Sequence, residues 1–289
     1  MSKRINSRIY VIDFLKLFSR LEYICGNVDL QLEHALKLTT RDLKHIDGLL
    51  IDSIPQMYNL IRTFPKYETV SFCYDIFRHS DMLETQLPVF ISRFMKNTMR
   101  KLILNNVYIN STDLQSIFKQ CPKLTCLSLH SNLDMRFQDN FNERSEKRPP
   151  YFDLSHIPQN RIEHLYLNGK MFLGVDKCIE SSHFSLQELC LQCGGLTIGD
   201  VLTKISNVEF PKLRILKLFG HDIINDDAAT CMWINLYKSC PNLEHVAITK
   251  LFKEVECQTL MDHCKKLKKI EVDGFENDNC LDICRFILY

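Results

Sequence analysis

The chain has 289 residues, with 36 Lys and Arg against 35 Asp and Glu, so its formal net charge is +1. This balance argues against a nucleic-acid binder, which usually carries a clear basic excess, and it gives no reason to expect attraction to an anionic membrane surface. Thirteen cysteines without a recognisable secretory signal predict free thiols in a cytoplasmic or nuclear protein.

One apolar pattern recurs along the chain, with apolar residues at the first, fourth and sixth places of each copy. The number of residues between the starts of successive copies is mostly in or near the range of roughly 20–29 that leucine-rich repeats show. The fourth and sixth residues point to the same side of a short strand, and one such strand cannot bury them alone, so the copies must stack. The ten copies begin at Leu21, Ile46, Tyr67, Met99, Leu124, Ile162, Leu186, Leu213, Leu243 and Leu267.

Between the strands the apolar spacing becomes helical. Helices are predicted at residues 87–95, 111–118, 226–237 and 257–264. A strand followed by a helix in each copy predicts an α/β leucine-rich-repeat solenoid of about ten repeats, a curved horseshoe with a parallel inner sheet and outer helices. The residues expected to be buried by the last three helices are Leu114, Ile117, Phe118, Met232, Trp233, Leu236, Leu260 and Met261.

The pattern predicts a single solenoid domain over residues 1–289, interrupted by an inserted loop at about 133–158. Residues 136–150 are polar and end in Pro149 and Pro150, a composition that favours a loop. Two interpretations remain open for this insertion. It is either a mobile segment without a role, or a flap that contacts the binding partner.

The segments Cys121-Pro122-Lys123-Leu124 and Cys240-Pro241-Asn242-Leu243, with the related Cys264-Lys265-Lys266-Leu267, precede predicted strands. They resemble the cysteine-containing leucine-rich repeats of F-box/leucine-rich-repeat proteins. The resemblance implies substrate recognition for an SCF-type ubiquitin ligase, with a Skp adaptor and a cullin as partners if an F-box lies outside this chain. No F-box is detected in residues 1–45, which lack its Leu-Pro opening and its Cys-x-x-x-Trp end. The alternative is a scaffold or inhibitor unrelated to ubiquitination.

A protein partner is expected on the concave strand face, where side chains at the third, fifth and seventh places of each copy point. Large apolar or aromatic groups there can dominate the binding energy of an interface, although scattered surface hydrophobes are also common. The predicted binding residues are Tyr166, Phe219, Ile103, His164, Ile215, Lys217 and His130.

No catalytic residue, metal or cofactor is predicted. Cys126, His164 and Glu188 occupy the third place of three successive copies, in the order of an activated thiol, but on a face open to water. Cys190-x-x-Cys193 offers only two of the four ligands of a structural zinc site. The chain is therefore expected to bind a protein rather than to catalyse a reaction.

Overall fold

The structure is a computed structural model, and its strands are parallel in every described pair. Two compact units, Met1–Leu124 and Thr125–Tyr289, are described separately as unit 1 and unit 2. Parallel strands with helices between them confirm the predicted α/β class. One continuous domain over residues 1–289 stays a prediction. The described residues are 23–28, 45–50, 68–73, 89, 91, 93, 95–105, 111–130, 152–159, 161–169, 172–193, 198–219, 227–248 and 254–272.

The described part of unit 1 has four parallel strands, paired in chain order. They are β1 (Tyr23–Val28), β2 (His45–Leu50), β3 (Thr69–Cys73) and β4 (Lys101–Asn105). In β4, Leu102 and Leu104 are fully buried, as the apolar pattern predicted. Helix α5 (Ser111–Gln120) follows, and it buries the three residues expected for its inner face, Leu114, Ile117 and Phe118.

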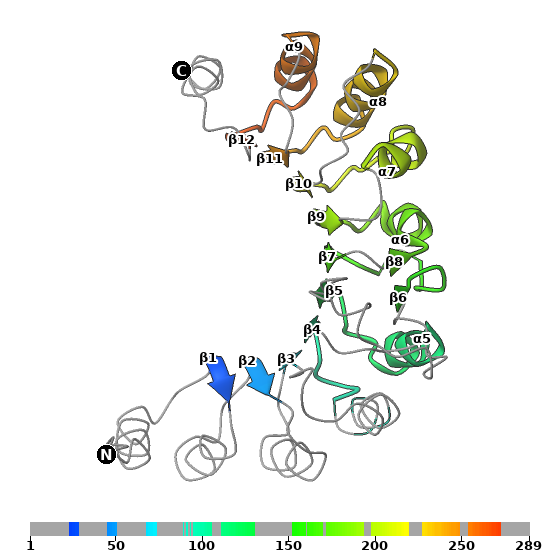
Figure 1. Ribbon diagram of the computed structural model, residues 1–289, viewed down its shortest axis with the longest axis vertical. Coiled ribbons are helices and arrows are strands. Elements are labelled where there is room, and N and C mark those ends of the chain that lie inside the picture. Colours follow the sequence, from blue (N-terminus) through cyan, green and yellow to red (C-terminus); the bar gives the residue numbers. More distant parts are fainter. Residues whose placement is uncertain are drawn as a thin grey trace, which may run out of the picture. The chain divides into compact units, whose positions relative to one another are not determined.

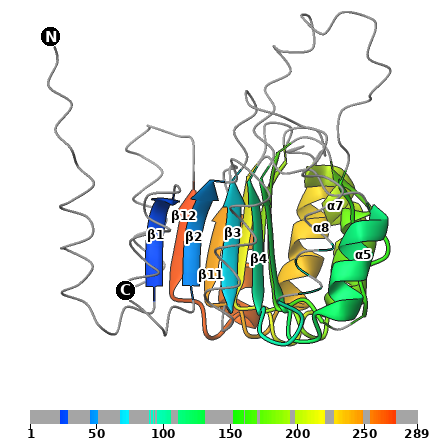
Figure 2. The same ribbon diagram turned by 90° about the horizontal axis from the view of Figure 1, so that it is seen from below.

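The described part of unit 2 has a row of six parallel strands with helices between them. In Figure 1 these strands run side by side and the helices lie together on one side of them, and Figure 2 shows labelled helices of this unit on one side of its labelled strands. The strands, in paired order, are β5 (Cys126–His130), β7 (His164–Gly169), β9 (Glu188–Cys193), β10 (Ile215–Phe219), β11 (His245–Ile248) and β12 (Lys269–Val272). The helices are α6 (Val175–Ser182), α7 (Ile198–Ile205), α8 (Asp227–Lys238) and α9 (Glu254–His263).

The fourth and sixth residues of the copies form two buried rows across the strands of unit 2. Leu189 lies opposite Leu165 on one neighbouring strand and opposite Leu216 on the other. In the copies that start between residues 124 and 243, the first, fourth and sixth residues are at most 1% exposed. The predicted core pattern is therefore confirmed for these copies. Leu267 and Ile270 are partly exposed, at the point where the described row of strands ends.

A backbone contact repeats at the second place of the copies, just before each strand begins. The carbonyl oxygen of Gln187 accepts hydrogen bonds from Arg214 N at 2.8 Å and from Ile215 N at 3.1 Å. Because one carbonyl binds two successive N–H groups of the next copy, the contact sets the register of the strand pair that follows. The same double acceptance occurs at the carbonyls of Glu68, Thr125, Glu163, Arg214 and Glu244.

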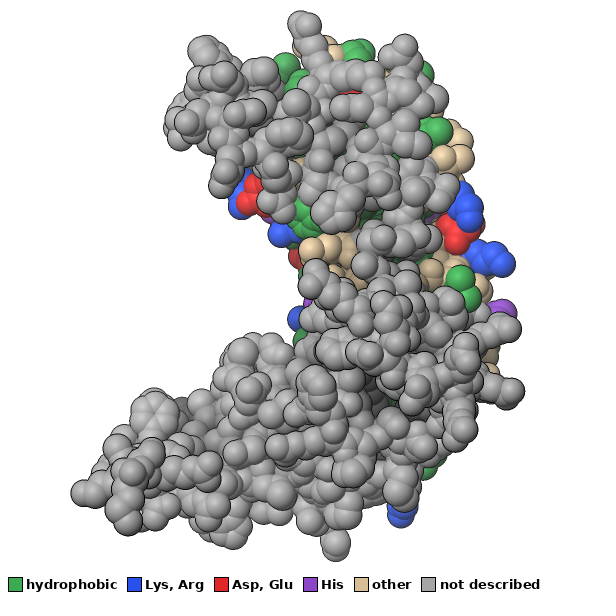
Figure 3. Space-filling model, viewed as in Figure 1, with side chains coloured by type: hydrophobic (Ala, Val, Ile, Leu, Met, Phe, Trp, Pro, Cys, Tyr) green, Lys and Arg blue, Asp and Glu red, His purple; other side chains and the backbone are tan. Residues whose placement is uncertain are grey.

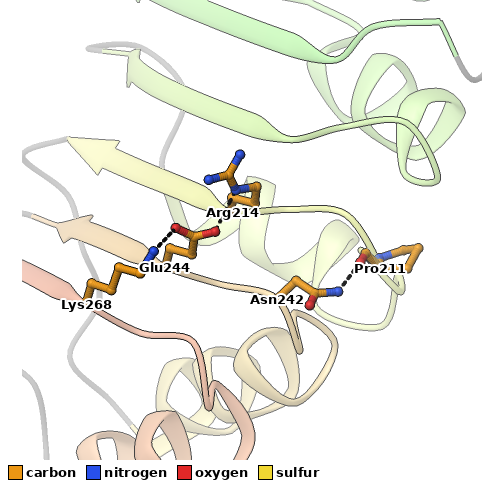
Figure 4. Close-up of polar contacts among 5 residues, drawn as sticks. All are labelled: Pro211, Arg214, Asn242, Glu244 and Lys268. Atoms are coloured by element: carbon orange, nitrogen blue, oxygen red, sulfur yellow. Dashed lines mark hydrogen bonds and ion pairs between the residues drawn. The ribbon is translucent and has the colours of Figure 1, made fainter.

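Charged side chains add to this contact just before β10, β11 and β12, as Figure 4 shows. Glu244 Oε1 accepts a hydrogen bond from Arg214 Nε at 2.7 Å, and Glu244 Oε2 accepts one from Lys268 Nζ at 2.8 Å. Asn242 Nδ2 donates to the carbonyl oxygen of Pro211 at 2.6 Å. Side chains at equivalent places thus link three consecutive copies.

The cysteines that precede the strands are buried, as predicted, and they also form hydrogen bonds. Cys121, Cys240 and Cys264 are at most 2% exposed, and each carbonyl accepts the N–H of the residue three places later, which closes a tight turn. The Cys264 thiol lies 3.5 Å from the carbonyl oxygens of Tyr237 and Cys240 in the preceding copy. Burial raises the pKa of Cys264 to about 11, so the thiol keeps its proton and can donate.

The helix prediction was incomplete in unit 2. Helices α6 and α7, of eight residues each, were not predicted. Helix α6 follows Gly174 and has no side-chain cap, so no capping residue marks its start. In α9, Leu260 is buried as expected, but the expected burial of Met261 is wrong, since its side chain is 40% exposed. Successive helical residues differ by about 100° in direction, so the burial of Leu260 does not by itself require the burial of Met261.

The predicted insertion at about 133–158 extends too far at its C-terminal end. Strand β6 (Phe152–Asp153) pairs in parallel with β8 (Phe172–Leu173). Leu154 is fully buried and Ile157 is 7% exposed. A short strand and the two buried residues Leu154 and Ile157 therefore lie within the C-terminal part of the predicted insertion, where apolar side chains follow the polar stretch. Residues 131–151 lie outside the described part, so the two interpretations of the polar segment both remain predictions.

Replacing Leu189 by alanine should lower the free energy of unfolding by about 2–5 kcal/mol, because a cavity would form in a fully buried row. Urea denaturation measures this change. Gln192 on the same strand is exposed, so Gln192→Ala is a matched control that should cost less than about 0.5 kcal/mol. Equal losses in the two variants would show that Leu189 is not a core residue.

Glu244 should stabilise the protein in a pH-dependent way. Hydrogen bonds from Arg214 and Lys268 lower the pKa of Glu244 to about 2, from an ordinary value of 4.5. A carboxyl group whose pKa falls on folding contributes stability above its unfolded pKa, and this contribution is lost as the pH drops towards the folded pKa. The stability difference between the wild type and Glu244→Gln, measured by urea denaturation, should therefore shrink between about pH 5 and pH 2. A difference that stays constant over this range would contradict the prediction.

Candidate functional site

The strand face of unit 2 that points away from α6, α7, α8 and α9 is the candidate site, and we call it the open face. Side chains alternate along a strand, so the third, fifth and seventh places lie on the open face when the fourth and sixth are in the core. At the inner edge of the described part, Figure 3 shows basic, acidic and hydrophobic side chains close to one another. Strand pairing aligns Cys126, His164, Glu188, Ile215, His245 and Lys269 in one row, and Ser128, Tyr166, Cys190, Lys217, Ala247 and Glu271 in the next.

Tyr166, Glu188 and His164 form a group of polar contacts on β7 and β9. The Tyr166 hydroxyl donates to Glu188 Oε2, and His164 Nδ1 lies 3.2 Å from the same oxygen. The pairing places Glu188 opposite His164, with Tyr166 on the diagonal. Sequence reasoning identified Tyr166 and His164 but missed the role of Glu188 in binding both. The third-place spacing was the available signal for His164 and Glu188, whereas the contact to Tyr166 depends on side-chain conformation.

The surroundings of Tyr166 keep its hydroxyl protonated. Burial of the ring, the hydrogen bond to Glu188 and the negative charge of Glu188 all raise the pKa of Tyr166 well above its ordinary value of 10. Burial also raises the pKa of Cys190, which lies opposite Tyr166, although the positive charge of Lys217 acts in the other direction. At neutral pH this part of the open face therefore presents a neutral phenol and a neutral thiol. Because Tyr166 is already held by Glu188, a partner that contacts it loses little side-chain entropy on binding.

The other two histidines of the open face also have polar partners. His245 Nε2 lies 2.9 Å from Glu271 Oε2, and Lys269 contacts the other carboxylate oxygen of Glu271. Hydrogen bonds from Lys269 and His245 lower the pKa of Glu271. On β5, His130 Nε2 lies 2.7 Å from Ser128 Oγ. Polar side chains on the outer strands of the row are thus engaged with one another.

The structure brings five of the seven predicted binding residues onto β7 and β10, which flank β9. His164 and Tyr166 lie on β7, Ile215, Lys217 and Phe219 lie on β10, and all five are partly exposed. His130 lies on β5, next to β7, and is also partly exposed.

The expected exposure of Ile103 in unit 1 is wrong, because its side chain is only 8% exposed. The alternation of a strand determines which face a residue occupies. It does not determine how far the neighbouring side chains cover that residue. Ile103 therefore offers little surface for a partner.

Strand pairing places Cys126, His164 and Glu188 side by side, as the sequence predicted. Glu188 contacts His164 in the way that a carboxylate orients a general base. The Cys126 side chain, however, is only 7% exposed. We therefore assign the row no catalytic role.

The described residues contain no group of three His, Cys, Asp or Glu side chains arranged to hold a metal ion. The eight cysteines with described side chains are free thiols. The Cys193 side chain lies outside the described residues, so the Cys190-x-x-Cys193 pattern is not tested as a half zinc site.

Comparison with known proteins gives no relative from which a function could be transferred. No protein-family model matches the chain, and no curated protein is significantly similar to it in sequence. Of the helices within the described ranges, none has the length and apolar character needed to cross a membrane.

Tyr166 should ionise only well above pH 10. An alkaline titration followed by the ultraviolet absorbance of phenolate measures this. The difference between the wild type and Tyr166→Phe gives the ionisation of Tyr166 alone. Glu188→Gln removes the carboxylate that disfavours the phenolate, so the Tyr166 transition should move to lower pH in this background. Glu163→Gln changes a neighbouring carboxylate that does not bind the phenol and should leave the transition in place. An ordinary Tyr166 transition in the wild type would contradict the described contact.

Proposed function

We propose that this chain is a protein-interaction module that binds another protein on the open face of unit 2. The observation that carries the proposal is a group of partly exposed side chains on the open face of β7, β9 and β10, among them Tyr166, Lys217 and Phe219. Large aromatic groups at fixed positions supply contact area with few rotatable bonds, and they often dominate interface energies. The backbone beneath them is held by paired strands, which keeps the surface ordered before a partner arrives.

The architecture that we propose for this module is a curved leucine-rich-repeat solenoid of about ten repeats. Two repeated features support it. The first, fourth and sixth places are buried in the copies that start between residues 124 and 243. The second-place carbonyl accepts two hydrogen bonds in six copies, including one in unit 1. In such a solenoid the strand face is the usual binding surface.

The role that we propose within a cell is substrate recognition for an F-box-type ubiquitin ligase. Its support is the set of Cys-containing junctions before the strands, in which Cys121, Cys240 and Cys264 are buried. Because residues 1–45 carry neither signature of an F-box, a scaffold or inhibitor unrelated to ubiquitin is the second candidate. A Skp adaptor and a cullin would accompany the first function and not the second.

The double variant Tyr166→Ala/Phe219→Ala should weaken partner binding by more than about 2 kcal/mol while leaving the fold intact. The full chain, immobilised and exposed to lysate of its source cells, provides the test through quantitative mass spectrometry of the retained proteins. Phe184 is a matched control, since it is 51% exposed and follows α6 rather than lying on the open face. Proteins retained by the wild type and by Phe184→Ala should be lost from the double variant. Equal retention by all three would exclude the open face as the binding surface.

The same purification separates the two cellular roles. Recovery of a Skp adaptor and a cullin with the wild type supports the ubiquitin-ligase role. Retained partners that are lost from the double variant, without adaptor or cullin, support a scaffold or inhibitor.

A further inference from the structure

Strand β10 presents an unusual combination on the open face, a lysine between two apolar side chains. Ile215, Lys217 and Phe219 are partly exposed, whereas Leu216 and Leu218 between them are fully buried. Alternate residues of a strand lie about 6.6 Å apart, so Ile215 and Phe219 are separated by about 13 Å with Lys217 midway. The strand therefore offers a cation at the centre of a short apolar stripe.

The neighbouring strands β9 and β11 also place uncharged side chains next to Lys217. The pairing places Cys190 of β9 and Ala247 of β11 opposite Lys217. Burial keeps the Cys190 thiol neutral by raising its pKa. Ala247 has no polar side-chain atom. The four nearest open-face positions around Lys217 thus contribute no carboxylate.

Lys217 differs in this respect from the other charged groups of the open face. Glu188 accepts from Tyr166 and lies beside His164, and Glu271 binds His245 and Lys269. Within the described ranges, Lys217 forms neither an ion pair nor a hydrogen bond. Glu188, on the neighbouring strand β9, is therefore already engaged, as is Glu271 on the more distant β12, and the Lys217 ammonium is left available to a partner.

We propose that Lys217 binds an Asp or Glu carboxylate of a partner protein, in an extended segment whose flanking apolar side chains contact Ile215 and Phe219. This inference rests on the proposed function and names the chemistry that the open face selects. Side chains two residues apart in an extended segment match the spacing on β10, so the order expected in the partner is apolar, any, acidic, any, apolar. Desolvation by the surrounding apolar groups would strengthen the ion pair relative to one in water.

A carboxylate suits this position better than a phosphate group. A phosphate carries about two negative charges, and proteins usually bind it with clustered arginines or several donors. On β9 and β11, the described open-face side chains next to β10 include no Arg or Lys. A single ammonium in an apolar surrounding therefore matches the single charge of a carboxylate.

The test is selection of binding peptides from a phage-displayed library of random peptides by the full chain. Wild-type protein should enrich the apolar-acidic-apolar order. Lys217→Met keeps the length of the side chain without its charge and should lose the acidic preference, while Lys217→Glu should replace it by a preference for Lys or Arg. Lys212 is exposed in the turn before β10, so Lys212→Glu is the matched control and should keep the wild-type preference. Unchanged enrichment in Lys217→Glu would overturn the inference.

Synthetic peptides of the selected sequence then identify the anion. Replacing the acidic residue by its amide should weaken binding to the wild type about tenfold, and it should have little effect on Lys217→Met. A phosphoserine peptide that binds more tightly than the carboxylate peptide would overturn the assignment of a carboxylate.

The same selection distinguishes failure of this inference from failure of the proposed function. Peptides that depend on Phe219 and Tyr166 but not on the charge at Lys217 would overturn the inference and leave the open face as a binding surface. Peptides enriched equally by the wild type and by Tyr166→Ala/Phe219→Ala would overturn both. A wild-type selection without enriched peptides would overturn the inference, and the lysate experiment would still decide the proposed function.

Discussion

The parallel, in-register pairing of short strands is the constraint on which the rest of unit 2 depends. Each second-place carbonyl, such as that of Gln187, accepts two N–H groups of the following copy. A shift of one residue would turn every core side chain of a strand to the open face. Leu189, Leu216 and their equivalents stay buried only because this register is kept along the row. The ion pairs of Glu244 with Arg214 and Lys268 act at the same edge.

The register also determines the chemistry of the open face. It aligns Glu188 with His164 and places both near Tyr166, so that these polar groups bind one another. It places Lys217 between Cys190 and Ala247, where no carboxylate is opposite. The same strand pairing thus gives two different results along the row. On β7 and β9 the polar side chains contact one another, whereas on β10 the Lys217 ammonium is available to a partner.

Much of the fold was predictable because burial has a period that the sequence displays. The one-four-six pattern predicted the core, and the helices around Phe118 and Trp233 were found where apolar residues recur at helical spacing. The short helices α6 and α7 were missed, since eight residues hold little periodic signal and Gly174 provides no capping side chain. The insertion was extended too far because the buried apolar residues described after Pro150, Leu154 and Ile157, are few.

The sequence alone determined which residues of the described strands in unit 2 face the core, because strand alternation and the stacking of copies leave one arrangement that buries the leucines. It also determined the set of side chains opposite the core, among them Tyr166, Lys217 and Phe219. Tertiary structure decided which of these are exposed and which are paired. Exposure at Ile103 and pairing at Glu188 depend on the conformations of side chains from adjacent copies, which lie more than twenty residues apart in the chain. Such contacts follow from packing in three dimensions and leave no local pattern in the sequence.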